Sequence, residues 1–259
     1  MRCCLPSRLS VVIIALMFAA PVCAEVTLNA GARLSHENNV NGSPDSPSKA
    51  NQVGDYSLAL SASAVYFTPL DAAQTDYFIG QLGVLATQYD KFDNLDNSMV
   101  VASVGYYKQL SETWSGQVTG RAFERDTRQH ARDSNGFGAT LEIKKQMTEK
   151  VWLKAVADYE DSRANLTSFS NSGATYGVNL GYLPEKDTFI NLGYSQGKRD
   201  YKSVAPFVSK SEMLFVEATQ RLAKNWYLSV GYAFQDNESN IAGTAYTNHI
   251  LSAGLNFSY

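Results

Sequence analysis

Hydrolytic chemistry would require a nucleophile beside a base, and the sequence offers few residues for either role. It contains only three histidines, His36, His130 and His249. A lipid hydrolase needs a positioned base next to a nucleophile or a metal ion. The one pairing that can be constructed is His249, near the end of the chain, with Ser35, near its start. This pairing lacks the Asn-His and Ser-Asn-Gly pattern of phospholipases, so we expect no catalytic residue and no enzyme.

Metal ligation is the second chemistry to consider. The acidic segments 90–97 and 235–240 could hold calcium weakly through carboxylate oxygens, but their spacing does not match an EF-hand. The three cysteines, at positions 3, 4 and 23, all lie close to the N-terminus. We therefore expect no metal site and no cofactor.

Electrostatic steering is the third chemistry, and here the residues are numerous. Charged side chains fall on the polar face of segments that alternate between apolar and polar residues. The nine that we predict to line a pore are Arg33, Arg121, Glu142, Lys144, Lys154, Asp158, Arg199, Glu217 and Arg221, and Glu160 lies on the same face. Two interpretations remain open: the charges line a narrow path that prefers anions, or they pair across neighbouring strands and fill the interior. For Arg121, Glu142 and Lys154 both interpretations carry equal weight.

The segments that must position these charges alternate with a period of two, which is typical of β-strands. In residues 56–66 every second residue, from Tyr56 through Leu58 and Leu60 to Tyr66, is apolar or alanine, and serines lie between several of them. Strands of ten or more residues match the 9–11 residues needed to cross a bilayer at a tilt. Twelve strands are predicted, at 26–36, 55–68, 77–89, 98–109, 114–125, 135–146, 151–160, 173–183, 188–199, 211–222, 226–235 and 248–259.

The connections between these strands alternate between short and long, and one hairpin is the repeating unit. Trp114, Val151, Thr188 and Trp226 follow equivalent short turns at spacings of 37, 37 and 38 residues. Trp114 and Trp226 fall where an interfacial aromatic belt is expected, whereas Trp152 is one residue out of register. A secreted soluble β-sandwich would also alternate, but shorter strands and a more aliphatic core are typical of that fold. The pattern favours an all-β transmembrane antiparallel barrel of about twelve strands, within a range of ten to fourteen.

The N-terminus predicts export. Arg2 and Arg8 precede an apolar run at 11–20, and Val22 and Ala24 suit the positions before a cleavage site. We predict a secretory signal peptide at 1–24 and a barrel domain at 25–259. The barrel domain carries 20 basic against 25 acidic residues, which argues against a nucleic-acid partner.

The C-terminal stretch "SAGLNFSY" resembles the sorting signal of bacterial outer-membrane proteins at Ser252, Gly254, Phe257 and Tyr259. This resemblance implies recognition by the barrel assembly machinery, after which the last strand closes against the first. It also implies a location in the cell outer membrane, with outer-membrane lipid and lipopolysaccharide as partners.

Two further stretches, "SHENNVNG" and "GYAFQDNESNIAGTAY", resemble segments of Gram-negative porins. They are also similar to the C-terminal barrel of the surface lipoprotein assembly modifier family, without the helical-repeat domain of that family. We predict a monomeric porin-like channel for small solutes or oligosaccharides that mildly prefers anions. The alternative is a non-conducting barrel that serves envelope assembly or export with a periplasmic partner. An outer-membrane lipid hydrolase is the remotest function considered.

Overall fold

The structure is a computed structural model that describes residues 25–45, 49–203 and 207–259. The predicted signal peptide lies outside the described residues. Twelve strands and four short 3-10 helices form the described chain: β1 (Glu25–Glu37), η2 (Lys49–Asn51), β2 (Asp55–Pro69), β3 (Asp76–Tyr89), η3 (Asp93–Leu95), β4 (Asn97–Gln109), β5 (Trp114–Thr127), η4 (His130–Arg132), β6 (Ser134–Thr148), β7 (Val151–Ala164), η5 (Thr167–Phe169), β8 (Asn171–Glu185), β9 (Thr188–Tyr201), β10 (Phe207–Ala223), β11 (Trp226–Ser239) and β12 (Tyr246–Ser258).

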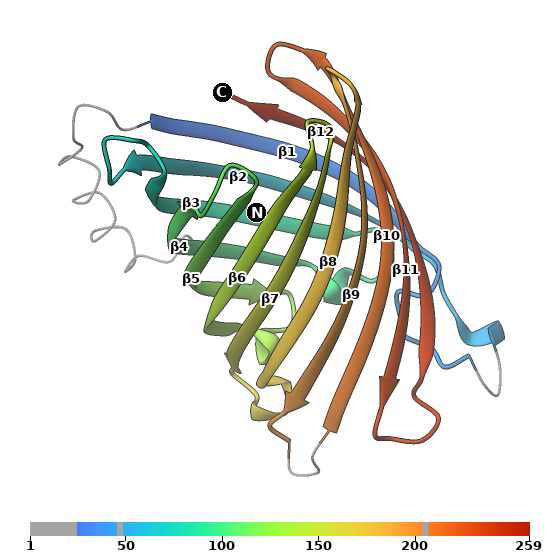
Figure 1. The fold of residues 1–259 in the computed structure, drawn as a ribbon. Helices are drawn as coiled ribbons and strands as arrows, with labels where there is room; N and C mark the ends of the chain where they lie inside the picture. The colour runs from blue at the N-terminus through green and yellow to red at the C-terminus, as the bar shows by residue number, and fades with distance from the viewer. Residues whose placement is uncertain (1–24, 46–48, 204–206) are drawn as a thin grey trace.

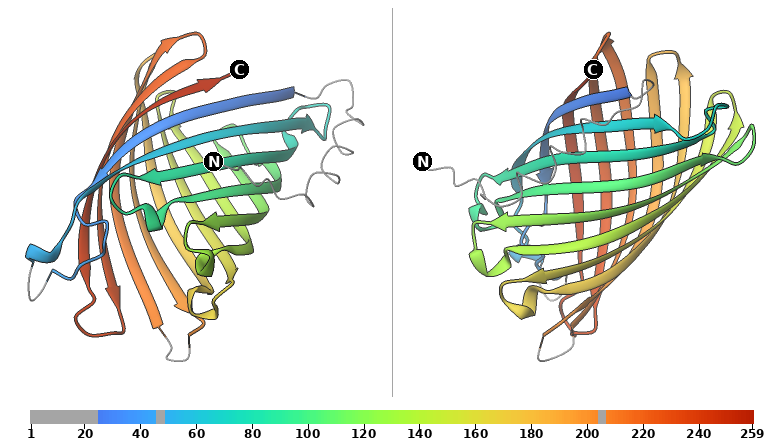
Figure 2. Two further views of the ribbon diagram at one scale, coloured as in Figure 1. Left: turned by 180° about the vertical axis from the view of Figure 1, so that it is seen from behind. Right: turned by 90° about the vertical axis from the view of Figure 1, so that its left-hand side faces the viewer.

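The strands form one closed antiparallel barrel (Figure 1). Each strand pairs with the next in sequence, and β12 closes against β1. At the chain end, Leu28 and Tyr259 exchange two backbone hydrogen bonds of 2.9 Å. The predicted twelve-stranded barrel is confirmed, and Figure 2 shows the short turns and the long loops at opposite ends of it.

Strand ends differ from the prediction by at most four residues, and the largest differences lie at the long-loop end. Strands β7, β10 and β11 each continue four residues further toward that end than predicted. Outward positions there carry charges such as Asp161, Lys210 and Glu238, which we had interpreted as loop residues. Backbone pairing continues through this polar rim because the strands extend beyond the apolar belt.

The outer face of the barrel is the apolar face of every strand. Directly opposed residues on paired strands share a face, and faces alternate along each strand. Val84 is 50 % exposed, Val104 59 % and Leu141 50 %, although all three lie near the middle of their strands. An exposed apolar face that continues around a closed barrel is the lipid-facing surface of a transmembrane barrel. Among the described residues, no helix has the length and apolar character that crossing a membrane requires.

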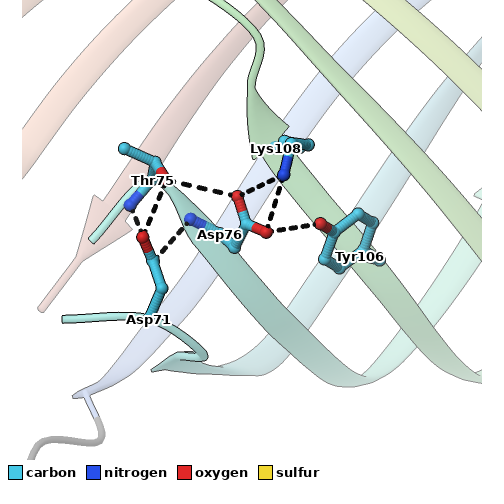
Figure 3. A network of polar contacts seen from close by, with 5 residues as sticks. All are labelled: Asp71, Thr75, Asp76, Tyr106 and Lys108. Carbon is cyan, nitrogen blue, oxygen red and sulfur yellow. Dashed lines mark hydrogen bonds and ion pairs between the residues drawn. The ribbon is translucent and has the colours of Figure 1, made fainter. Parts of the chain in front are cut away.

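Hydrogen bonds fix the turn between β2 and β3, at the short-turn end (Figure 3). Asp71 accepts the backbone N–H groups of Thr75 and Asp76, each at 2.9 Å. Asp76 accepts from the Tyr106 hydroxyl at 2.6 Å and from Lys108 Nζ at 3.0 Å. The N–H of Asp76 and the Thr75 hydroxyl lower the pKa of Asp71 against a smaller opposing effect of desolvation. The β2–β3 turn is therefore joined to the end of β4.

At the other end, residues 38–45 of the first long loop are fixed to β12 and to the residue before it. Asn39 is 1 % exposed; its backbone N–H donates to Asn248 Oδ1 at 3.1 Å and its side-chain amide to the Thr247 carbonyl at 2.9 Å. Asp55, which is 2 % exposed, accepts the backbone N–H of Phe92 at 3.0 Å. These buried polar contacts bind the first loop and the β3–β4 loop to the barrel rim.

Candidate functional site: the barrel lumen

All nine residues that we predicted to line a pore lie on the inner face, as does Glu160. The strand register places Arg121 opposite Ser103 and Gly138, on the face away from the exposed apolar residues. The ion pair between Arg33 on β1 and Glu217 on β10 supports this assignment, because β12 and β11 separate these strands along the wall. A lumenal position does not establish a role in permeation, which stays a prediction.

The most highly connected charge in the lumen is Arg121 on β5. Its guanidinium donates to Asp158 at 2.6 and 3.0 Å and to Glu160 at 3.0 Å, both on β7. Thr140 on the intervening β6 accepts from Arg121 at 3.1 Å and donates to Asp158 at 2.6 Å. A bidentate arginine with two carboxylates is a charge-assisted network, and such networks are stronger than isolated pairs.

This network lies flat against the wall because the residue opposite Arg121 is glycine. A Cβ atom at Gly138 would lie 2.6 Å from Arg121 Cζ and 2.7 Å from the Tyr159 carbonyl oxygen. Real Cβ atoms do not approach that closely, so any other residue would displace the guanidinium or the backbone. The glycine allows Arg121 to cross β6 along the wall rather than project into the lumen.

A second polar cluster lies near the short-turn end, on β6, β7 and β9. Lys154 Nζ is 3.2 Å from Glu142 Oε2. Lys144 Nζ lies 4.6 Å from the centre of the Trp152 ring, which stacks on Phe189 at 5.0 Å with an angle of 7°. A cavity of about 390 Å³, the inner cavity, lies beside these side chains, and Tyr107, Asn179 and Asn191 also line it.

The position of Trp152, which broke the sequence repeat, has a physical reason. Trp152 points inward opposite Gly181, and a Cβ at that glycine would lie 2.2 Å from the indole ring. The glycine leaves room for the indole to lie over β8 and reach Phe189 on β9. Trp152 thus belongs to the lumen, unlike Trp114 and Trp226.

The Arg33–Glu217 pair crosses the seam where the first and last strands meet. Arg33 Nη2 lies 2.6 Å from Glu217 Oε2, and the arginine side chain is 45 % exposed. The inner face between them consists of Gly254, Ser229 and Gly231, which are small enough for the side chains to pass over. The seam itself has nine paired positions, fewer than any other strand pair of the barrel, and this contact adds a link across it.

The remaining predicted cations differ in their surroundings. Arg221 donates to the Lys224 carbonyl at 2.7 Å and lies 3.7 Å from Asp187, so it is bound to the short-turn rim. Arg199 and Lys144 form no ion pair within the part of the chain that the structure describes. The same holds for Arg125, an inward cation that we missed, whose guanidinium lies 5.6 Å from the Phe123 ring. The alternation could have identified Arg125, because it lies four residues after Arg121 on β5 and therefore on the same face.

The part of the inner face that adjoins β5 is almost neutral. Strands β2, β3 and β4 present serine, glycine, glutamine and apolar residues inward, such as Ser63, Gln81 and Ser103. Over these three strands, all of which the structure describes in full, the one inward charge is Asp55 at the rim. We call this surface the neutral wall, and the surface of β5, β6 and β7 the charged wall.

The predicted sorting-signal residues occupy the two faces of β12. Ser252 and Gly254 face inward and Phe257 and Tyr259 outward, where Tyr259 is 75 % exposed. Trp226 contacts Phe257 with ring centres 5.1 Å apart. Trp114 and Trp226 are 41 % and 44 % exposed on the outer face, at the start of β5 and β11. Their roles in sorting and at the membrane interface stay predictions.

The structure does not bring His249 and Ser35 together. Ser35 pairs with Ser252 on the inner face, whereas His249 faces outward and is 2.8 Å from the Tyr232 hydroxyl. His130 contacts Asp133 at 3.0 Å in the β5–β6 loop. Burial alone would raise the pKa of Asp133, but the Thr127 N–H and the His130 ring outweigh burial and lower it. No group of three or more histidine, cysteine or acidic residues in the described chain is arranged to hold a metal ion.

Solved structures with the same architecture are numerous. No protein-family model matches the chain, and no curated protein matches it. An outer membrane channel from Pseudomonas putida F1 superposes with a TM-score of 0.65 at 10 % identity, covering 93 % of this chain and 97 % of the channel. The chain has the fold of a porin-like outer-membrane barrel.

A second solved structure, the KdgM porin in complex with disordered oligogalacturonate, gives a TM-score of 0.52 at 11 % identity. The match covers 89 % of this chain and 99 % of the porin. The similarity to the barrel of the surface lipoprotein assembly modifier family receives no support from these comparisons and stays a prediction.

Proposed function

We propose that this protein is an outer-membrane channel that conducts small solutes and prefers anions modestly. Its outer face meets outer-membrane lipid and lipopolysaccharide. The fold that it shares with a porin and with an outer membrane channel supports this proposal. The arrangement of lumen charges also supports it, because Arg121 lies flat against the charged wall and the adjoining wall of β2, β3 and β4 presents neutral side chains to the lumen.

The anion preference rests on cations that carry no ion pair in the described residues. Carboxylates neutralise Arg121, Lys154 and Arg33 at 2.6–3.2 Å. Arg125, Lys144 and Arg199 remain as inward positive charges spread over β5, β6 and β9. This is the single observation that carries the predicted selectivity. Against these cations stand the second carboxylate beside Arg121 and the inward Glu37 and Asp55 at the rim, so the attraction of anions, which acts over about one Debye length, should be modest.

The reversal potential across a salt gradient in planar bilayers tests this proposal. The wild-type channel should prefer anions at low salt and lose that preference toward 1 M, where the Debye length is about 3 Å. Replacing Arg125, Lys144 and Arg199 together by glutamine should move the reversal potential toward zero. These cations are better targets than Arg33 or Arg221, whose partners would be left without a cation.

The matched control removes the same charge from the outer face. Arg163, Lys198 and Lys210 face outward at the long-loop end, and their replacement by glutamine should leave the reversal potential nearly unchanged. Equal effects of the two triple variants would show that net charge, not the lumen, sets selectivity. A folded barrel that never conducts would refute the channel and favour the assembly or export role with a periplasmic partner.

A further inference from the structure

A second cavity lies at the mouth of the barrel, at the long-loop end. This outer cavity has a volume of about 510 Å³. One side comes from the inner faces of β10, β11 and β12 together with the first loop, and the other from the β3–β4 and β5–β6 loops. Its size is within the range of small-molecule sites. A solute that enters the lumen from this end passes beside it.

Aromatic rings contribute to both sides of the outer cavity. Phe207 and Tyr246 point inward from β10 and β12, and Phe92 comes from the β3–β4 loop. Phe207 is supported by Tyr201, with ring centres 5.0 Å apart, and the Tyr246 ring lies over Gly42, where a Cβ would be 3.3 Å from it. The Asp55 contact to its backbone fixes Phe92. These rings are held in place before any ligand arrives.

The polar lining consists mainly of neutral groups that both donate and accept hydrogen bonds. Asparagine, serine and threonine side chains share it with one cation: Asn41, Asn94, Ser209, Asn237, Ser239, Thr244 and Arg132. Glu238 also borders the cavity, but it occupies an outward position on β11. Asn237 is 6 % exposed, and its amide nitrogen has no partner in the described chain, although its oxygen accepts from Gln235 at 3.1 Å. Arg132 Nε is likewise buried without a described acceptor, while its guanidinium lies 4.8 Å from the Phe169 ring.

We propose that the outer cavity is a vestibule that binds one or two rings of a neutral saccharide. Sugars combine apolar C–H faces, which pack on aromatic rings, with hydroxyls that pair with amides and hydroxyls. Six of the seven polar side chains are neutral, and the guanidinium of the seventh, Arg132, already lies over the Phe169 ring, so we expect the lining to select for hydrogen-bonding groups more than for net charge. This inference rests on the proposed channel function, and it names neutral saccharides as the class of solute that binds at the long-loop end of the channel.

Calorimetric titration of the purified barrel in detergent tests the vestibule with maltohexaose, cellohexaose and a galacturonate hexamer. We expect at least one neutral sugar to bind, with little salt dependence. Tyr246→Ala should weaken that binding at least about tenfold, equivalent to about 1.4 kcal/mol. Arg132→Gln, which leaves the Tyr246–Gly42 contact intact, should weaken it by a smaller factor and serves if Tyr246→Ala fails to fold.

The controls are Tyr176→Ala and Arg163→Gln, which change the same residue types at outward positions that are exposed. Both should bind sugar as the wild type does. Binding of no sugar, binding of galacturonate alone, or binding unchanged in both cavity variants would overturn the vestibule. Conductance is measured separately. Sugar binding without conductance would refute the channel and support the vestibule. Conductance without sugar binding would support the channel and refute the vestibule.

Discussion

The charged wall and the neutral wall face the same lumen but differ in what their inward side chains require. On the charged wall, Arg121 satisfies Asp158 and Glu160 across three strands, and Gly138 gives it room to lie flat. On the neutral wall, Ser63 and Ser103 need no partner beyond water and their neighbours, and no long side chain requires a glycine opposite it. The contrast teaches that Arg121 and its two carboxylates satisfy one another along their own wall, so the adjoining neutral wall needs no charge to compensate them.

The largest expected effect is the loss of stability when the central cation of the charged wall is removed. Arg121→Gln leaves Asp158 and Glu160 close together without their cation. Removing one partner of a buried pair costs about 3–5 kcal/mol, and we expect about 2 kcal/mol here because these side chains are partly exposed to the lumen. Urea unfolding of the detergent-solubilised barrel measures the loss. Ser103→Ala, at the cross-strand neighbour of Arg121 on β4, should cost less than about 0.5 kcal/mol. Equal losses in the two variants would contradict the distinction between the walls.

A smaller effect is expected from adding one methyl group to each wall. At Gly138 a Cβ would meet Arg121 Cζ at 2.6 Å, whereas at Gly83 on the neutral wall the nearest atom, Val101 Cγ1, is 3.3 Å away. Gly138→Ala should destabilise the barrel by about 1–3 kcal/mol through overpacking. Gly83→Ala should be close to neutral by the same unfolding measurement. A tolerated Gly138→Ala would mean that Arg121 does not need to lie against the wall.

The smallest expected effect concerns the Arg33–Glu217 pair at the seam. It is a single contact whose arginine is 45 % exposed, so its coupling energy should be below about 1 kcal/mol. A double-mutant cycle with Arg33→Gln and Glu217→Gln measures that energy by unfolding. A coupling as large as the loss in Arg121→Gln would show that an isolated lumenal pair stabilises as much as the network, and the contrast between the two regions would fail.

The sequence predicted the hairpin order, the strand count and the face of each charge, because period-two patterning determines all three. It did not predict which charges meet. The Arg121–Asp158 contact spans two strand spacings and depends on Gly138, and Arg33 reaches Glu217 only because the strands between them carry small residues. Such contacts depend on the register between neighbouring strands and on the closure of the barrel, and the residue pattern of a single strand specifies neither. For Trp152, alternation predicted the inward position but gave no reason for it; the room for the indole comes from Gly181, which lies 29 residues further along the chain.

The outer cavity was also beyond prediction from the sequence. Phe92, Arg132 and Tyr246 come from three different hairpins, and no motif joins them. The strand extensions on β10 and β11 bring Phe207 and Asn237 into the rim, at positions that we had assigned to loops. The long-loop end was therefore the least accurate part of the prediction and is also where the solute-binding site is proposed.

The central claim is that the neutral wall borders an open path, and single-channel conductance in planar bilayers tests it most directly. Ser63 faces inward on β2, opposite Asn29 and Gly83, whereas the preceding Ala62 faces outward. Ser63→Trp should lower the conductance severalfold, and Ala62→Trp, which places the same ring in lipid, should conduct as the wild type does. Both variants must show the heat-dependent gel shift of a folded barrel. A wild-type conductance in Ser63→Trp, or no conductance in the wild type itself, would contradict the account.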